Sequence, residues 1–369
     1  MNSGTFKSSP DFPFNFPSYE DWIEVARQEL EGADPNEKLS LKKENLEICA
    51  FYTADQKEKK SSPSLKASLN PYYGARSWAN TPKILVSDQK KANEMAVAHL
   101  NYGADGLLFD CQSVAINPTI LLNNISITDC SVSFLINDDK NNWLNDFRIF
   151  AESNFDKNEI RGCIFWKSAP EKLNGTVQCF ASWPKFFSLG MMIPSQEDAV
   201  DEIAQSLNKV VQWIEVSEKN LTAQMILDQI AFSTAVGTDF FLDIAKIKSL
   251  RNLWNQVRGA YQVANTRYLH IHSNSTLWMN DIFQPHGNMI KSTTSAMAAI
   301  AGGCNSLTVE AEDATNETMS RIARNVSTIL REECHFSKVA DPTAGSYYMD
   351  SITDQLSEKV WIKFQSLMK

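Results

Sequence analysis

The sequence predicts an α/β fold, a single (β/α)8 TIM barrel preceded by an extended N-terminal arm. From about Pro82 onward, short apolar runs alternate with segments of helical periodicity, and eight such runs can be counted. The closing segment, residues 292–348, repeats this alternation with two helices around a short strand. Because periodicity does not show whether a sheet closes, a doubly wound open sheet remains the alternative.

The first 17 residues are rich in serine, phenylalanine and proline and are expected to be extended. Phe12, Phe14 and Phe16 alternate with proline or asparagine. Exposed aromatic runs of this kind usually need an apolar surface to cover them. That surface is either this chain's own barrel or another subunit.

A helix is predicted to begin at Ser18, whose hydroxyl can accept from amides of the first turn. Glu20 and Asp21 favour its positive end, and Gly32 ends it. Its apolar face is expected to hold four side chains, Trp22, Val25, Ala26 and Leu30. Residues 33–53 have the composition of a connector. We therefore expect an arm over residues 1–65 and a barrel domain over residues 66–369.

The barrel strands are predicted at the eight apolar runs, Lys83–Val86, Gly106–Asp110, Ser131–Ile136, Arg161–Trp166, Phe186–Met191, Ile230–Val236, Tyr268–His272 and Ser306–Val309. Among the intervening segments, residues 238–257 have the clearest helical spacing, and Trp254 is expected in the core.

Two helices are predicted in the closing segment. The first is rich in small residues (295–301) and ends at Gly302-Gly303. The second is amphipathic, with an apolar face of Ile322, Val326, Ile329 and Leu330. The turn after it, Asp341 to Gly345, is expected to be structural, with Gly345 in a conformation that a side chain would strain.

Composition excludes several functional classes. The net charge is −9, and the short lysine runs at 57–60 and 90–91 are typical of solvated faces, so nucleic acid is not an expected partner. The seven cysteines are scattered and never spaced CxxC, which argues against a zinc site and favours reduced thiols. No signal-peptide pattern and no 18-residue apolar run occurs. We expect a cytoplasmic chain without membrane contact.

The residues alone suggest one candidate cluster. His270 and His272 alternate on the predicted strand, so both face one side, and Ser273 follows. At the carboxyl end of a barrel strand they would lie where barrel enzymes hold their chemistry. The alternative is two hydrogen-bonded structural histidines. No third metal ligand stands at motif spacing, and neither G-x-S-x-G nor HExxH occurs, so no metal site is predicted.

Several motifs carry a family resemblance that spans the chain from about Trp22 to Lys369. IAGGCNSL, RIARN and DPTAGSYY resemble the closing part of the barrel domain in the methylmalonyl-CoA mutase family. FSTAVGTDFFLDIAKIKSLRNLW, YLHIHSNSTLW and QPHGNMIKSTTSAMAA resemble its strand-six and strand-seven segments. The resemblance implies the barrel fold, and it implies an N-terminal arm that wraps a partner subunit.

The family's catalytic residues are not found at the matching positions. Its catalytic members hold adenosylcobalamin on the carboxyl face of the barrel, and their thioester substrate threads the barrel. The tyrosine near the end of strand one falls near Lys83, and the histidine after strand five falls near Met191. An arginine and a serine that hold CoA correspond to Gln229 and Ala231. The resemblance therefore implies no catalytic and no cofactor-binding residue on this chain.

Some substrate-pocket residues are expected to remain. Arg76 and Trp78 keep the family's Arg-Pro-Trp motif with Ser77 in place of proline. With His270, His272 and Ser273, they form the predicted pocket remnants.

The overall pattern resembles the small subunit of heterodimeric bacterial mutases. The cobalt-ligand motif D-x-H-x-x-G does not occur, so we expect a barrel domain without a cobalamin-binding domain. Small subunits usually carry a degenerate domain of that type, and in this respect the chain departs from them. The resemblance implies a large catalytic partner that carries adenosylcobalamin and the acyl-CoA, in a complex that interconverts (R)-methylmalonyl-CoA and succinyl-CoA in propionate metabolism. The alternatives are a catalytic barrel served by a separate cobalamin-binding chain and a free-standing pseudoenzyme that binds a CoA ester.

Overall fold

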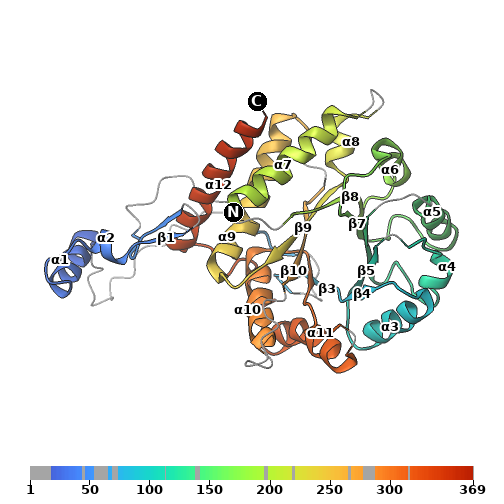
Figure 1. Cartoon of the computed structure of the whole chain (residues 1–369), viewed down its shortest axis with the longest axis horizontal. Helices are drawn as coiled ribbons and strands as arrows, with labels where there is room; N and C mark the ends of the chain where they lie inside the picture. The colour runs from blue at the N-terminus through green and yellow to red at the C-terminus, as the bar shows by residue number, and fades with distance from the viewer. Residues whose placement is uncertain are drawn as a thin grey trace, which may run out of the picture.

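The computed structural model describes residues 18–43, 46–53, 65–68, 74–112, 114–137, 142–194, 198–217, 221–264, 267–276, 287–314 and 316–368 (Figure 1). Nine parallel strands form one sheet, β3 (Ala79–Asn80), β4 (Lys83–Leu85), β5 (Gly106–Gln112), β6 (Ser131–Ile136), β7 (Gly162–Trp166), β8 (Phe186–Met192), β9 (Ile230–Val236), β10 (His270–Ser275) and β11 (Ser306–Thr308).

The sheet closes into a barrel because β3 and β4 are two halves of one strand. The order β3-β11-β10-β9-β8-β7-β6-β5-β4 has these two halves at its ends. The Thr81 amide donates to the Leu307 carbonyl at 2.9 Å, and the Leu108 amide donates to the Pro82 carbonyl at 3.0 Å. Pro82 has no N–H of its own, so the ladder is interrupted there. The predicted (β/α)8 barrel is confirmed, with this split strand as strand one.

The predicted strands lie close to the observed ones, with two differences. The first half of strand one, Ala79–Asn80, was not predicted. Strand seven was placed at Tyr268–His272, but β10 begins at His270 and continues to Ser275. This shift moves both strand-seven histidines from the carboxyl end to the amino half of the strand.

Helices surround the barrel (Figure 1). They are α3 (Gln89–Asn101), α4 (Pro118–Leu121), α5 (Trp143–Asn154), α6 (Leu173–Phe180), α7 (Ala199–Glu215), α8 (Ala223–Leu227), α9 (Phe240–Ala260), α10 (Gly287–Gly302), α11 (Glu317–Glu332) and α12 (Tyr347–Leu367). Their apolar faces and the outward faces of the strands form the main core. Trp254 lies there, 2% exposed and edge-on to Phe232, as predicted.

The buried face of α11 differs from the predicted one. Ile329 is 44% exposed, whereas Ala323, Arg324, Ser327 and Leu330 are buried. Two of these are polar because they bind side chains just before strand one and on α3. The Ser327 hydroxyl accepts from Trp78 Nε1 at 2.8 Å, and Arg324 Nη1 lies 3.2 Å from His99 Nδ1.

The N-terminal arm projects from the side of the barrel (Figure 1). It comprises α1 (Tyr19–Glu29), α2 (Pro35–Leu39) and a hairpin of β1 (Leu41–Lys43) and β2 (Leu46–Ile48). Ser18 caps α1 as predicted, in a reciprocal capping box with Asp21. Of the four side chains predicted on its apolar face, Ala26 is buried and the others are not, because α1 lies away from the barrel (Figure 1). Phe12, Phe14 and Phe16 lie outside the described residues.

The hairpin, in contrast, is attached to the barrel. Leu46 is 1% exposed and belongs to the main core, and an ion pair joins Lys43 to Asp239 at the start of α9. Tyr52, just after β2, packs edge-on against Tyr348 of α12, with ring centroids 5.6 Å apart. Residues 33–53 were expected to be a simple connector, but they also anchor the arm to the barrel.

The turn after α11 is also anchored. Lys248 Nζ lies 3.0 Å from both carboxylate oxygens of Asp341 and 2.5 Å from Thr343 Oγ1. Gly345 has φ +84°, which confirms its predicted left-handed conformation.

Candidate functional site

Side chains fill the axis of the barrel. An inner cluster of Leu108, Leu135, Cys163, Phe165 and Ala231 is almost fully buried, and Phe187 and Met192 pack against it. Phe165 packs against the His272 ring at 5.3 Å, and Phe187 packs against the His270 ring at 5.6 Å. The interior is a packed core rather than a channel.

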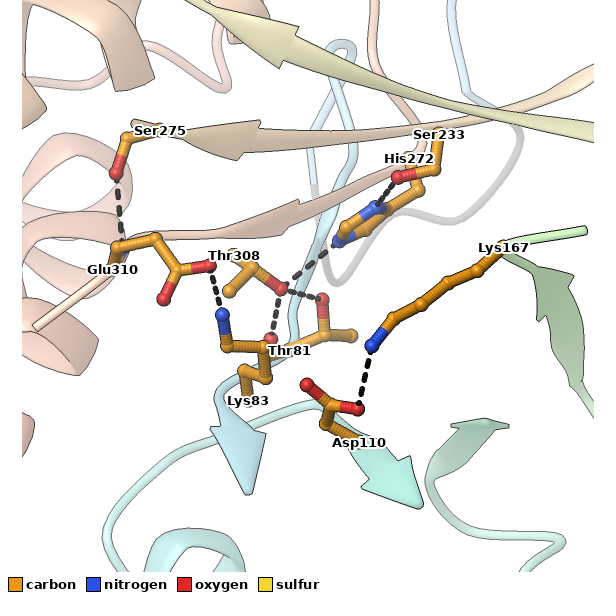
Figure 2. Close-up of polar contacts among 9 residues, drawn as sticks. All are labelled: Thr81, Lys83, Asp110, Lys167, Ser233, His272, Ser275, Thr308 and Glu310. Carbon is orange, nitrogen blue, oxygen red and sulfur yellow. Dashed lines mark hydrogen bonds and ion pairs between the residues drawn. The ribbon is translucent and has the colours of Figure 1, made fainter. Parts of the chain in front are cut away.

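His272 lies at the centre of a hydrogen-bonded network within the barrel (Figure 2). Its Nδ1 lies 2.7 Å from Ser233 Oγ, and its Nε2 lies 2.9 Å from Thr308 Oγ1. The Thr308 hydroxyl donates to the Thr81 carbonyl at 2.5 Å, so it accepts from His272 Nε2–H. Nδ1 then accepts from Ser233, and this arrangement satisfies a neutral ring with its proton on Nε2.

His270 is engaged in the same way, with Nε2 2.9 Å from Ser306 Oγ. Burial, followed by the nearby Arg251 guanidinium, lowers the pKa of His270 to about 4. Burial, followed by His270 and Lys83, lowers the pKa of His272 to about 3. Both rings are therefore neutral near pH 7.

The expected location of these histidines at the carboxyl end of their strand was wrong. Because β10 begins at His270, that ring lies at the amino end and lines a cavity there. Ser273 is fully buried on the opposite face of the strand, so it does not join the two rings.

Two ion pairs lie at the carboxyl end of the barrel (Figure 2). Lys83 Nζ is 2.5 Å from Glu310 Oε1, and Lys167 Nζ is 3.4 Å from Asp110 Oδ1. The Glu310 amide donates to Ser275 Oγ at 2.9 Å, which positions the acidic residue. Sequence reasoning missed these pairs, because their partners are up to 227 residues apart.

Met191 does not face the axis. It is 3% exposed and belongs to the core between strands and helices. Its neighbours Gly190 and Met192 have the inward positions, and a Cβ on Gly190 would lie 2.6 Å from Phe165 Cδ1. Gly190 is therefore required for the Phe165 ring to lie across the axis.

Gln229 and Ala231, where the resemblance implied CoA-holding residues, both have structural contacts in the barrel. Gln229 Oε1 accepts from the Ser188 amide at 3.2 Å and the Ser188 hydroxyl at 3.0 Å, and Ala231 belongs to the inner cluster.

A cavity of about 480 Å³ opens at the amino end of the barrel, with Phe187 and His270 among its lining residues. Arg161 and Arg267 also line it, but their guanidinium groups bind main-chain carbonyls. Arg161 Nη2 donates to Thr128 and Asp129, and Arg267 donates to Trp183, Phe186 and Asp228. These arginines hold together the amino ends of the strands.

Arg76 and Trp78 both lie in the segment just before strand one. Trp78 is 2% exposed and lines the cavity, while Arg331 lies over its ring at 4.9 Å and donates to its carbonyl at 2.6 Å. Arg76 is 7% exposed, and its Nη2 donates to the Ser77 carbonyl at 3.4 Å. Burial lowers the pKa of Arg76. The structure therefore brings Trp78 and His270 to one cavity and does not bring the five predicted pocket residues together.

The described residues contain neither a metal-binding cluster nor a membrane-spanning helix. No three His, Cys, Asp or Glu side chains gather as a metal site there. Within the same ranges, no helix is long and apolar enough to cross a membrane.

Comparison with known proteins shows similarity to methylmalonyl-CoA mutases. Residues 191–369 match the family model described as methylmalonyl-CoA mutase. The chain is 29% identical to the methylmalonyl-CoA mutase small subunit of Porphyromonas gingivalis, over 95% of this chain and 62% of that protein. It is 30% identical to the probable methylmalonyl-CoA mutase small subunit of Mycobacterium bovis, over 50% of this chain and 31% of that protein. The chain thus spans less than two thirds of the length of these relatives.

Proposed function

We propose that this chain, which belongs to the methylmalonyl-CoA mutase family, is the small, non-catalytic subunit of a heterodimeric mutase. In this proposal a homologous large subunit binds adenosylcobalamin and the acyl-CoA, and the complex interconverts (R)-methylmalonyl-CoA and succinyl-CoA. The observation that carries the proposal is the filled axis of the barrel.

A substrate that threads the barrel needs an open axis. Here Phe165 is 1% exposed and Leu108 is 4% exposed, with the two histidine rings packed beside the aromatic side chains. Emptying a buried phenylalanine site costs about 3–5 kcal/mol. Displacing Phe165 would also break its contact with the His272 ring. Passage of a thioester chain along the barrel axis would therefore cost much free energy.

The positions expected to perform the chemistry support the same role. Lys83, where the family tyrosine is expected, is paired with Glu310. The side chain of Met191, near the family histidine position, points into the outer core. Neither side chain can take over the expected function, since an ammonium cannot supply a phenol and a thioether donates no hydrogen bond.

The described residues at the carboxyl face do not fit adenosylcobalamin. Two ion pairs lie at that face, and both nitrogens of the nearby His272 are engaged inside the barrel. We therefore place the cofactor on the large subunit and derive no step through it on this chain.

Its contribution is then structural, and the arm is the part best suited to it. The hairpin holds the base of the arm against α9 and α12, while α1 and α2 extend beyond the barrel (Figure 1). Val25 at 56%, Leu39 at 45% and Leu41 at 56% exposure are apolar side chains that a partner could cover. All seven cysteines are free, which suits a complex in the reducing cytoplasm.

Deletion of residues 1–32 tests the proposal. The truncated chain keeps α2 and the hairpin, so the barrel and its anchor should remain folded. We expect it to bind the large subunit at least about tenfold more weakly than the full chain, equivalent to about 1.4 kcal/mol. Isothermal calorimetry with the separately purified large subunit of the same organism measures this.

Two controls accompany the deletion. A truncation of residues 1–17 keeps α1 and separates the contribution of the helix from that of the residues before it. Thermal melting of each variant shows whether the barrel is intact. Full affinity after removal of residues 1–32 would mean that these residues do not bind the partner, and a wild-type chain that binds no large subunit would overturn the proposed function.

A further inference from the structure

The hairpin of the arm has two edges of different character. One edge, on β2, is covered by a side chain of α12. The Glu47 amide donates to Gln355 Oε1 at 3.2 Å, and Gln355 Nε2 donates to the Glu47 carbonyl at 3.1 Å. The amide of Gln355 thus pairs with Glu47 as a neighbouring strand would. The N–H and C=O groups of Glu47 consequently point away from β1.

The orientation of Glu47 fixes that of Lys42 on the other strand. Lys42 is paired with Glu47, between the pairs Leu41↔Ile48 and Lys43↔Leu46. In an antiparallel ladder, hydrogen-bonded and non-hydrogen-bonded pairs alternate. Because Glu47 directs its main-chain groups to Gln355, Lys42↔Glu47 is a non-hydrogen-bonded pair. The N–H and C=O of Lys42 therefore point outward, from the open edge of β1.

That open edge has no cover among the described residues. Apart from the bonds within helices and strands, no hydrogen bond among the described residues uses the main-chain groups of Lys42, and its side chain is exposed. Open strand edges are templates for a further strand, and soluble proteins normally cover or charge them. Gln355 thus covers one edge of this hairpin, and no described residue covers the other.

We infer that the partner subunit adds a β-strand to the open edge of β1, pairing with the N–H and C=O of Lys42. The inference rests on the proposed function, in which the arm contacts the large subunit, and it identifies the part of the arm that does so. Strand addition gives affinity through main-chain hydrogen bonds, while the side chains on either side select the sequence.

The charges at the edge indicate which strand fits. Lys42 is exposed at this edge, whereas Lys43 is neutralised by Asp239. A second copy of this chain, pairing β1 with β1 about Lys42, would place two ammonium groups opposite each other, which is unfavourable. An acidic residue opposite Lys42 is favourable. The exposed Leu39 and Leu41 add an apolar contact beside it. The occupant is therefore a strand of the large subunit that combines an acidic residue with an apolar one.

Replacement of Lys42 by proline separates the edge from the rest of the arm. Proline removes the outward N–H, and since this N–H takes no part in the β1–β2 ladder, the hairpin should persist. Leu41 before it is extended, as a residue before proline prefers. The matched control, Lys42→Ala, removes the charge and keeps the N–H. We expect Lys42→Pro to weaken binding of the large subunit about tenfold or more, and Lys42→Ala about threefold or less.

Hydrogen exchange gives a second measurement on the wild-type complex. The Lys42 amide should exchange rapidly in the free chain and at least about tenfold more slowly in the complex. If the complex forms but Lys42→Pro binds like wild type, or the Lys42 amide exchanges as fast as in the free chain, strand addition is wrong while the proposed function stands. If the wild-type chain binds no large subunit, both fail. Equal losses for Lys42→Pro and Lys42→Ala would show a charge contact instead and also overturn strand addition.

Discussion

Lys83 and Glu310 are joined by an ion pair across the carboxyl end of the barrel, with Nζ 2.5 Å from Oε1 (Figure 2). Lys83 begins the second half of strand one, and Glu310 follows strand eight. The pair therefore links the two strands at which the barrel closes. It also occupies the place where the family resemblance implies a tyrosine.

The purified chain alone should form no succinyl-CoA from methylmalonyl-CoA when adenosylcobalamin is added. The filled axis leaves no path for the thioester, so Lys83→Tyr should be inactive as well. The measurement is succinyl-CoA formation by chromatography, with the reconstituted complex as the positive control. Product formed by the lone chain above a no-protein blank would contradict the non-catalytic role.

Gly190→Ala should destabilise the barrel. A Cβ at this position would lie 2.6 Å from both Ile164 O and Phe165 Cδ1, and the first of these is main chain that cannot move aside. Overpacking of this kind costs about 1–3 kcal/mol. Chemical denaturation measures the loss. Gly259→Ala in α9 is the matched control, because its Cβ meets nothing within 4 Å and alanine favours a helix. Equal stability of the two variants would refute close packing at Gly190.

Gly345→Val should lower the melting temperature without a specific activity defect in the complex. Gly345 has φ +84°, and a side chain there meets no atom within 4 Å, so the cost is conformational rather than steric. It should amount to about 1 kcal/mol or more. Gly345→Asn should lower the melting temperature less than Gly345→Val, since asparagine tolerates positive φ. An unchanged melting temperature for the valine variant would count against the assignment.

The two barrel histidines should make the chain less stable in mild acid. Their folded pKa values, about 4 for His270 and about 3 for His272, lie below the ordinary 6.5. Below pH 6.5 the unfolded chain therefore binds more protons than the folded one. The free energy of unfolding therefore has its full value above pH 6.5. It falls by about 1.4 kcal/mol per pH unit for each ring until the pH reaches about 4 for His270 and about 3 for His272.

The slope of the unfolding free energy against pH shows whether His272 contributes to this loss of stability in acid. Between pH 6 and pH 5, the free energy of unfolding of His272→Gln should depend less steeply on pH than that of the wild type. The difference should be about one proton, or about 1.4 kcal/mol per pH unit. The slope is informative even if the variant is less stable throughout. A variant with the wild-type slope would show that His272 is not the buried neutral group described.

The sequence by itself determined the local elements. Apolar runs bounded by turn residues located the strands, and Ser18 with Asp21 located the start of α1. Positions such as Trp254 in the core and Gly345 in a left-handed turn followed from local patterns. These features depend on neighbours within a few residues, so the chain's own periodicity and capping chemistry suffice to predict them.

Only the tertiary structure decided what lies inside the barrel. A period of two places His270 and His272 on one face, but the start of β10 determines which end of the barrel they reach. Their neutral state depends on Ser233, Ser306 and Thr308, 36 to 39 residues away. Closure of the barrel through the split strand is likewise long-range. So is the hydrogen bonding of Gln355 to the main chain of Glu47, which lies 308 residues away in the sequence. Such contacts arise when the sheet curls and the helices pack, and no local pattern encodes them.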